Sequence, residues 1–163
     1  MGAFPEYIYT FLSSASKEKI LDFFDVYFSK ENYFLKKSGT SFAVYEPKTQ
    51  VNLYYNSFIP CINIHLEERE SVSVINLKFS LLNSVKWIIS MIVLFVVFLE
   101  GSLFFLWWNS QLSSPLLTLI PLGIAFLVYG FSKIFLLLST KQILGRIEVE
   151  MTKNNLIEEK LDK

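Results

Sequence analysis

The sequence predicts an α+β domain joined to a transmembrane helical hairpin, and two features of the chain support this. Residues 85–138 form two long apolar runs in succession, and the charged residues among them are Lys86, Glu100 and Lys133. Residues 1–82 instead hold short segments in which apolar and polar residues alternate, as in strands, around one segment with helical spacing. We therefore expect a soluble domain built on a small antiparallel sheet, followed by a hairpin of two membrane-spanning helices.

The two apolar runs have the length that a lipid bilayer requires. The first, 87–108, covers about 33 Å at a helical rise of about 1.5 Å per residue, and the second, 115–138, covers about 36 Å. The hydrocarbon core of a bilayer is about 30 Å thick, so each run spans it with a modest tilt. The candidate interface anchors, whose side chains favour or reach the headgroup region, are Trp87, Trp107, Trp108 and Lys133.

One amphipathic helix is expected in the soluble domain. Ile20, Phe24, Tyr27 and Phe28 recur at helical spacing between residues 17 and 31, while charged residues occupy many of the other positions. The segment 13–16 contains three serines that are candidate N-caps for this helix. The pattern therefore predicts a helix with one buried side.

Short strands are expected on either side of this helix. Turn residues separate them, notably Ser38-Gly39 and the charged run 67–70. Repeated hairpins of this kind give an antiparallel sheet with one wet face, and we expect the helix to cover the other face. The predicted strands cover residues 7–12, 33–36, 41–46, 51–55, 58–66 and 75–81.

The segment after the hairpin, 139–163, fits two patterns. Leu144, Ile147 and Met151 have helical spacing, whereas residues 146–152 also alternate as a strand would. Oppositely charged side chains recur four positions apart, which supports a helix. We favour an amphipathic helix that continues from the second apolar run.

Composition argues against several functional classes. The formal net charge is zero, and neither 1–86 nor 139–163 has the basic excess that binding a nucleic-acid backbone needs. Cys61 is the only cysteine and His65 the only histidine, so we expect neither a disulfide framework nor a Cys/His metal site. No spacing of serine, histidine, cysteine or acidic residues matches a catalytic set. We expect no cofactor and no enzymatic activity.

Glu100 is the strongest candidate for a functional residue. It lies eight residues before the end of the first run, roughly 12 Å inside the outer edge of the membrane. An ionisable group at that depth costs on the order of 3 kcal/mol and usually faces protein or water. It could form a proton- or ion-linked site, or contact a partner helix. Alternatively, its carboxyl bonds a backbone carbonyl of the second run, where Pro121 removes one donor near Gly123.

Two glycines extend this candidate intramembrane contact. Gly123 and Gly130 lie seven residues apart and so share one side of the second helix. Small residues let helices approach closely in a membrane, although glycine is also generally common in such helices. The candidate site therefore consists of Glu100, Pro121, Gly123 and Gly130.

The distribution of basic residues predicts that both termini lie in the cytoplasm. The connecting turn, residues 109–114, has no charge. Basic residues flank the other ends of the two runs, and such residues stay on the cytoplasmic side. They are Lys78, Lys86, Lys133, Lys141 and Arg146. We expect a multi-pass protein of the cell membrane.

These features favour a non-enzymatic accessory, binding or regulatory subunit of a membrane-associated complex. Its expected partners are membrane lipids and either another membrane protein or further copies of this chain. Two alternatives remain open. One is a module that binds a lipid or another apolar ligand at the membrane surface, with the aromatic residues of 4–58 as the pocket. The other is an immunity-type protein that protects against a membrane-active toxin.

Overall fold

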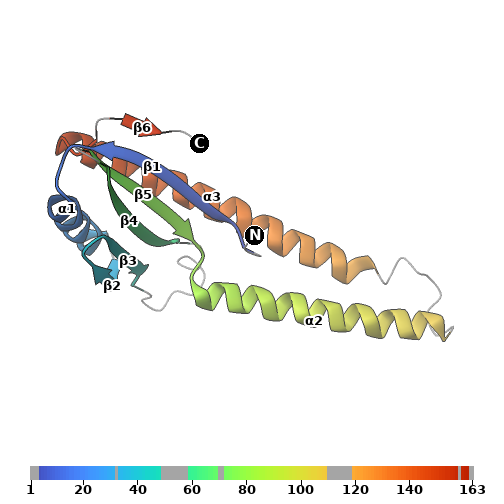
Figure 1. Ribbon diagram of the computed structural model, residues 1–163. Coiled ribbons are helices and arrows are strands. Elements are labelled where there is room, and N and C mark those ends of the chain that lie inside the picture. Colours follow the sequence, from blue (N-terminus) through green and yellow to red (C-terminus); the bar gives the residue numbers. More distant parts are fainter. Residues whose placement is uncertain are drawn as a thin grey trace. The chain divides into compact units, whose positions relative to one another are not determined.

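The computed structural model describes residues 4–31, 33–48, 59–69, 72–109, 119–157 and 159–161. The chain forms two compact units. One, the sheet domain, comprises Met1–Leu82 and Leu136–Lys163, and the other, the hairpin unit, comprises Asn83–Phe135. In chain order the elements are β1 (Glu6–Ser13), α1 (Lys17–Lys30), β2 (Tyr33–Gly39), β3 (Phe42–Pro47), β4 (Cys61–Arg69), β5 (Val72–Ser80), α2 (Asn83–Trp108), α3 (Ile120–Lys153) and β6 (Glu159–Leu161) (Figure 1).

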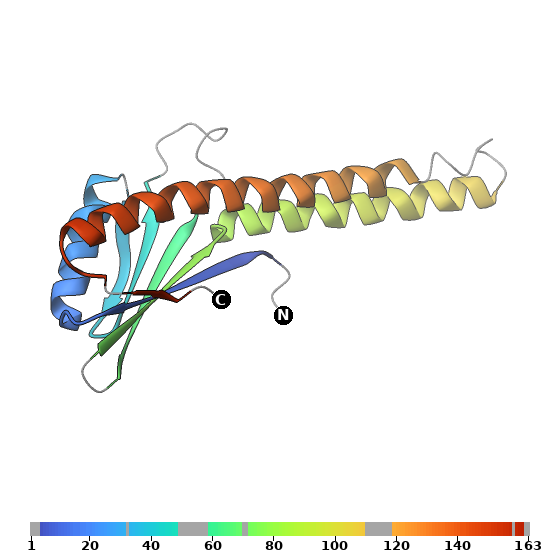
Figure 2. The ribbon, with the colours of Figure 1, turned by 90° about the horizontal axis from the view of Figure 1, so that it is seen from above.

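One antiparallel sheet forms the base of the sheet domain. Its strands lie in the order β2-β3-β4-β5-β1-β6, and each neighbouring pair is antiparallel (Figure 2). Five of these strands have six to nine residues, and β6 has three. β1 lies between β5 and β6, so the first and last strands of the described chain are neighbours at one side of the sheet. The predicted α+β fold with an antiparallel sheet is confirmed.

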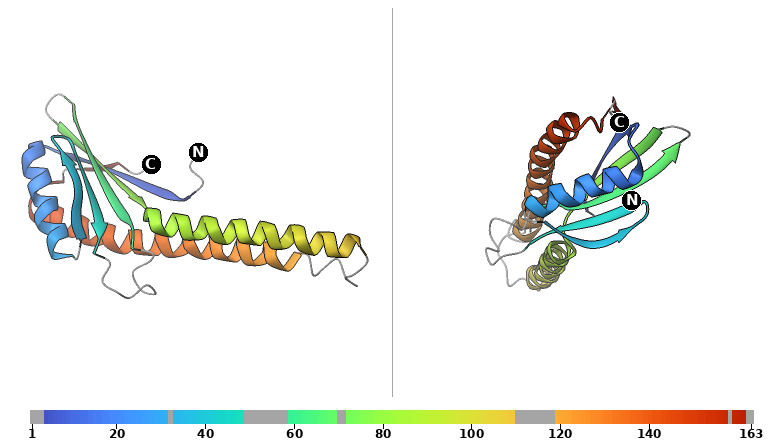
Figure 3. Two further views of the ribbon diagram at one scale, coloured as in Figure 1. Left: turned by 90° about the horizontal axis from the view of Figure 1, so that it is seen from below. Right: turned by 90° about the vertical axis from the view of Figure 1, so that its left-hand side faces the viewer.

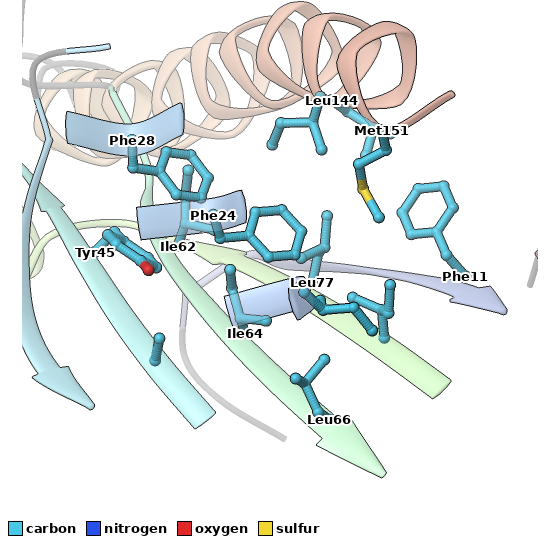
Figure 4. Close-up of a cluster of buried hydrophobic side chains, with 14 of the residues drawn as sticks. Phe11, Phe24, Phe28, Tyr45, Ile62, Ile64, Leu66, Leu77, Leu144 and Met151 are labelled. Atoms are coloured by element: carbon cyan, nitrogen blue, oxygen red, sulfur yellow. The ribbon is translucent and has the colours of Figure 1, made fainter. Parts of the chain in front are cut away.

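One face of the sheet carries the hydrophobic core. Ile64 on β4 and Leu77 on β5 are register partners, so their side chains share that face, and both are almost fully buried. The sequence predicted one covering helix, but two helical segments contribute to this core: α1 and the C-terminal half of α3. The side chains that these segments place in the core include Phe24, Phe28, Leu144 and Met151 (Figure 4).

α1 begins as the sequence pattern predicts and lies across the strands (Figure 3). Ser16 is its N-cap, and the Ser16 hydroxyl accepts a hydrogen bond from the backbone N–H of Lys19. The Ser73 hydroxyl of β5 donates to the backbone carbonyl of Ala15 over 2.9 Å, which ties the turn before α1 to the sheet. Three residues of the predicted apolar stripe, Ile20, Phe24 and Phe28, are buried, whereas the fourth, Tyr27, is only partly buried.

The segment after the hairpin is helical, which decides between its two predicted patterns. α3 continues through it, and Leu144, Ile147 and Met151 are buried in the core. The helix ends where Asn155 takes a left-handed φ of 51° and the backbone N–H of Leu156 donates to the carbonyl of Met151 over 2.9 Å. This is a Schellman-type C-cap, with its usual apolar contact between Leu156 and Met151. The chain then turns back, and β6, which the sequence did not predict, pairs with β1.

The turn between β2 and β3 lies two residues later than predicted. Gly39 pairs with Phe42, so the turn consists of Thr40 and Ser41 instead of Ser38-Gly39. The Phe42 ring lies so close to Gly39 that a Cβ there would clash with it. A side chain at this position would require the Phe42 ring to move, whereas the turn itself does not use the glycine.

β4 begins and ends three residues later than the predicted strand 58–66. Residues 67–69 were expected in a solvated turn, but they pair with residues 72–74 and so extend β4 and β5 as one hairpin. Charged side chains on the exposed end of a strand resemble a turn in sequence, because both are solvated. The predicted strand 51–55 lies outside the described residues.

The sheet domain is discontinuous in sequence. Leu144, Ile147, Met151 and Leu156 belong to the same core as the strands and α1. The boundary expected at residue 82 therefore separates two parts of one hydrophobic core, and the C-terminal segment completes it.

The hairpin unit contains α2 and the first part of α3, which run antiparallel (Figures 1 and 3). Both helices are long and apolar enough to span a membrane. Only 11% of the most apolar 18-residue stretch of each helix is buried, so most of its side chains face outward instead of into a protein core. The second span was expected to begin at Pro115, whereas α3 begins at Ile120 and residues 115–118 lie outside the described part of the chain.

Candidate functional site

A groove with a volume of about 1250 Å³ lies between α1 and the C-terminal half of α3. Both walls belong to the sheet domain, so the groove is a feature of one compact unit. Residues that follow α3, Asn154 and Leu156, also line it. The groove lies between two helices whose other sides cover the sheet.

The α1 wall is one face of that helix. Phe23, Val26 and Tyr27 lie three and four positions apart and line the groove. Their neighbours Phe24 and Phe28 point into the core instead. α1 therefore carries two apolar sides, one that packs on the sheet and one that lines the groove.

The α3 wall is built in the same way. Gly145 and Val149 line the groove, whereas Leu144 and Ile147 are buried in the core. Val149 is 54% exposed, and Val26 on the opposite wall is 57% exposed. An apolar surface that is half open to solvent on two facing helices can contact another molecule.

Charged side chains surround this apolar surface. Arg146 Nη1 lies 3.2 Å from Glu31 Oε2, which connects the two walls. Lys19, Lys30 and Lys141 also line the groove, and within the described ranges no carboxylate lies close enough to pair with them. The groove therefore has a surplus of unpaired cations.

Tyr27 supplies a neutral polar group on the α1 wall. Partial burial, and next the negative charge of Glu31, raise the pKa of the Tyr27 hydroxyl to about 12. Its hydroxyl therefore keeps its proton at physiological pH and can donate or accept a hydrogen bond. This wall thus combines apolar contact area with one neutral hydrogen-bonding group.

In the hairpin unit, Glu100 lies on the more covered side of α2. Val85, Ile89 and Val96 are the buried residues of this helix, and Glu100 follows four positions later on the same side. The Glu100 side chain is partly exposed, but its Oε2 is buried and has no hydrogen-bond partner among the described residues. A carboxyl oxygen without a partner in an apolar setting is costly, so this residue remains a candidate contact.

The backbone carbonyl that Pro121 was expected to leave unpaired, that of Leu117, lies outside the described residues. Pro121 is the second residue of α3, in the first helical turn. Backbone N–H groups in a first turn have no intrahelical acceptor, so a proline there does not deprive the helix of a hydrogen bond. Pro121 is therefore well placed for the start of α3.

Among the described residues, Gly123 and Gly130 do not lie at a close helix contact. A Cβ added at Gly123 or Gly130 would meet no neighbouring group of the described chain within 4 Å, so α2 does not pack on these glycines. Lys133 is exposed on α3. Trp87 and Trp108, near the two ends of α2, are 68% and 73% exposed, and Trp107 is less exposed. These are positions from which side chains can reach a bilayer interface.

The residue types that catalysis most often uses are not gathered in the described part of the chain. His65 is exposed on β4, with its Nε2 4.0 Å from a Glu67 carboxylate oxygen. Cys61 is a buried cysteine at the start of the same strand. The described residues contain no group of three potential His, Cys, Asp or Glu metal ligands.

Sequence reasoning missed the groove. Glu31 and Arg146, whose ion pair connects its walls, are 115 positions apart. One signal was present: Phe23 and Val26 of α1 are apolar but lie outside its predicted buried stripe. Comparison with known proteins gave no match to a family model, a curated protein or a solved structure.

Proposed function

We propose that this chain is a non-enzymatic accessory or binding subunit that its helical hairpin holds in the cell membrane. The observation that carries the proposal is the exposure of the hairpin: α2 and α3 are long and apolar enough to span a membrane, and their apolar stretches are only 11% buried. The core helix of a soluble protein has the same composition but is mostly buried. An exposed apolar surface of this extent requires a lipid or protein environment.

The proposed topology places both termini, and with them the sheet domain, in the cytoplasm. Basic residues flank the hairpin on the side of the sheet domain, whereas the connecting turn carries none. Such an asymmetry orients membrane helices with the basic side in the cytoplasm. The groove between α1 and α3 would then be available to a cytoplasmic segment of a partner.

Two features support a binding role. The groove offers half-exposed apolar side chains surrounded by lysines that have no ion pair within the described residues. In the hairpin, Glu100 has a carboxyl oxygen without a hydrogen-bond partner in the described chain, which a polar group of another helix would satisfy. The partner is another membrane protein or a second copy of this chain.

Carbonate extraction and cysteine labelling test membrane integration and topology together. The chain should stay in the membrane pellet under alkaline carbonate. With Cys61 replaced by Ala, a cysteine placed at Gln111 should react with an impermeant maleimide added to intact cells, and one at Thr152 should react only after lysis. Release by carbonate would overturn the membrane assignment, and labelling at Thr152 in intact cells would overturn the topology.

Purification in a mild detergent tests the accessory role. A membrane-protein partner or a second copy should remain bound in a fixed ratio. A monomer that carries only lipid would instead support the lipid-binding alternative. For that alternative the groove is the candidate pocket, because several aromatic residues of 4–58 fill the core: Phe11, Phe24, Phe28 and Tyr45 are at most 2% exposed (Figure 4).

A further inference from the structure

We infer that the groove between α1 and the C-terminal half of α3 binds an amphipathic helix of a protein partner, about three turns long, whose apolar stripe is flanked by acidic residues. The inference rests on the proposed function as a binding subunit and names the surface and the chemistry of the partner. Three properties of the groove support it: its length, its apolar lining and its unpaired charges.

The length of the groove matches a short helix. Its α1 wall extends from Lys19 to Glu31, about 18 Å at the helical rise, which equals roughly three turns of a bound helix. Its volume of about 1250 Å³ exceeds the roughly 300–1,000 Å³ that is typical of small-molecule pockets. The size therefore favours a polypeptide segment over a small ligand.

The apolar lining supplies the contacts that such a helix needs. Val26 and Val149 come from opposite walls and are 57% and 54% exposed, and Phe23 and Tyr27 are partly buried beside Val26. A helix laid between α1 and α3 would insert side chains at positions i, i+3, i+4 and i+7 between these residues. Such a site is open along its length, whereas an acyl chain is better held in an enclosed apolar tunnel.

The charges of the groove favour a partner that has acidic residues beside its apolar stripe. Glu31 is neutralised by Arg146, and Glu150 by Lys153. The remaining ionic side chains of the lining are three lysines and one aspartate, none of which has an ion pair among the described residues: Lys19, Lys30, Lys141 and Asp22. Glutamate or aspartate residues on both sides of an apolar stripe complement this surplus and select the partner.

Fluorescence anisotropy with a designed peptide tests the inference on the full chain in a non-ionic maltoside detergent. The probe is a labelled helical peptide of about 14 residues, with leucine along one face and glutamate on both flanks. Its counterpart has the same leucines with lysine flanks. Binding to empty micelles is subtracted. We expect the acidic peptide to bind about tenfold or more tightly than the basic one, and to weaken as salt is raised.

Substitutions at the surface of the groove localise the binding. Val149→Asp should weaken binding of the acidic peptide by about tenfold or more, whereas Ile8→Asp should leave this affinity unchanged. Ile8 is the matched control because it is 58% exposed and lies on a strand. Lys30→Glu combined with Lys141→Glu should reverse the preference between the two peptides. Lys48→Glu, at an exposed position outside the groove, should not reverse this preference.

Three results would overturn the inference. One is equal affinity for both peptides, and another is an equal loss in Val149→Asp and Ile8→Asp. The third is failure of both peptides together with phosphatidylglycerol that stays bound in native mass spectrometry and is lost in Val149→Asp, which would make the groove a lipid site. Carbonate extraction of the same variants keeps the two proposals distinguishable. A chain that stays in the membrane but binds no peptide refutes only the groove, and a chain released by carbonate refutes the membrane anchor.

Discussion

Arg146 Nη1 on α3 lies 3.2 Å from Oε2 of Glu31, the C-cap residue of α1. The two residues of this ion pair are 115 positions apart in the chain. Both side chains are partly exposed, at 57% and 40%. Water and salt screen such a pair, so its contribution to stability is small even though its position is informative. It marks where the C-terminal half of α3 meets α1.

A double-mutant cycle should measure this contribution. We expect Glu31→Gln and Arg146→Gln to show a coupling free energy of about 0.2–1 kcal/mol, which falls as the salt concentration rises. Thermal unfolding of the four chains in detergent gives the values. A coupling above about 2 kcal/mol would mean that the pair is buried, contrary to its exposure.

Neighbouring residues of α3 should respond very differently to truncation. Ile147 is fully buried, so Ile147→Ala should destabilise the sheet domain by about 2–5 kcal/mol. Val149, two positions later, is 54% exposed, and Val149→Ala should change stability by less than about 0.5 kcal/mol. The denaturant midpoints of the two variants measure these changes in stability. Equal effects would contradict the helical packing of this segment.

Removal of the Tyr33 hydroxyl should not destabilise the chain. The Tyr33 hydroxyl is buried and has no hydrogen-bond partner among the described residues. Tyr33→Phe keeps the ring and removes an unsatisfied polar atom, so it should be neutral or stabilising by up to about 1 kcal/mol. Tyr33→Ala, which also removes the ring from the core, should cost about 3–5 kcal/mol. A loss above about 1 kcal/mol in Tyr33→Phe would show that the hydroxyl has a partner.

Alkaline pH should destabilise the sheet domain through its tyrosines. Burial raises the pKa of Tyr27 from 10.0 to about 12, and it also raises the pKa values of Tyr33 and Tyr45. Between these values the unfolded chain loses protons that the folded chain retains, so the stability is fully present below pH 10 and falls as the pH rises toward 12.

Thermal midpoints across this pH range test the assignment. The Tyr27→Phe chain should lose less stability between pH 10 and 12 than the unmodified chain does. Tyrosinate absorbance should show one titration fewer in the Tyr27→Phe chain than in the unmodified chain. The missing titration should lie at the upper end of this pH range. Identical pH profiles for the two chains would refute the contribution of Tyr27.

Substitutions at Glu100 distinguish a passive hairpin from one that contacts a partner. Glu100→Gln keeps hydrogen-bonding groups of the same shape, whereas Glu100→Leu removes them. We expect Glu100→Leu to abolish co-purification of the partner and Glu100→Gln to retain part of it, because an amide still bonds across helices. The measurement is pull-down yield at matched expression. Equal failure of both variants would indicate that the charge or the proton matters, and normal yield with Glu100→Leu would end the case for this residue.

The elements with strong periodicity could be predicted from sequence. Ile20, Phe24 and Phe28 fix the buried side of α1, and the long apolar runs identify α2 and much of α3. β6 could not be found in this way, because three residues are too few to show an alternating pattern. Its existence depends on Asn155, whose left-handed conformation ends α3 and turns the chain back toward β1.

The groove depended on tertiary contacts that no local pattern contains. Val26 reads as one apolar residue among the charged ones of α1, and Val149 fits a strand as well as a helix. They form one surface only because α1 and α3 cover the same face of the sheet. The turn error at Ser38-Gly39 has a similar cause, since the glycine serves the ring of Phe42, which lies across the turn.

The discontinuity of the sheet domain has a consequence for how the protein is made. The ribosome delivers the five long strands and α1 first, next the hairpin, and only at the end Leu144, Ile147 and Met151. Until then the apolar face of the sheet lacks part of its cover, and the nascent domain stays open to chaperones and proteases. A chain whose synthesis has stopped in the hairpin lacks the C-terminal half of α3 and cannot bury Phe11 and Leu77 beneath it. Folding of the sheet domain is therefore completed only after the hairpin has been synthesised, and under the proposed membrane anchoring it would also follow insertion of the hairpin.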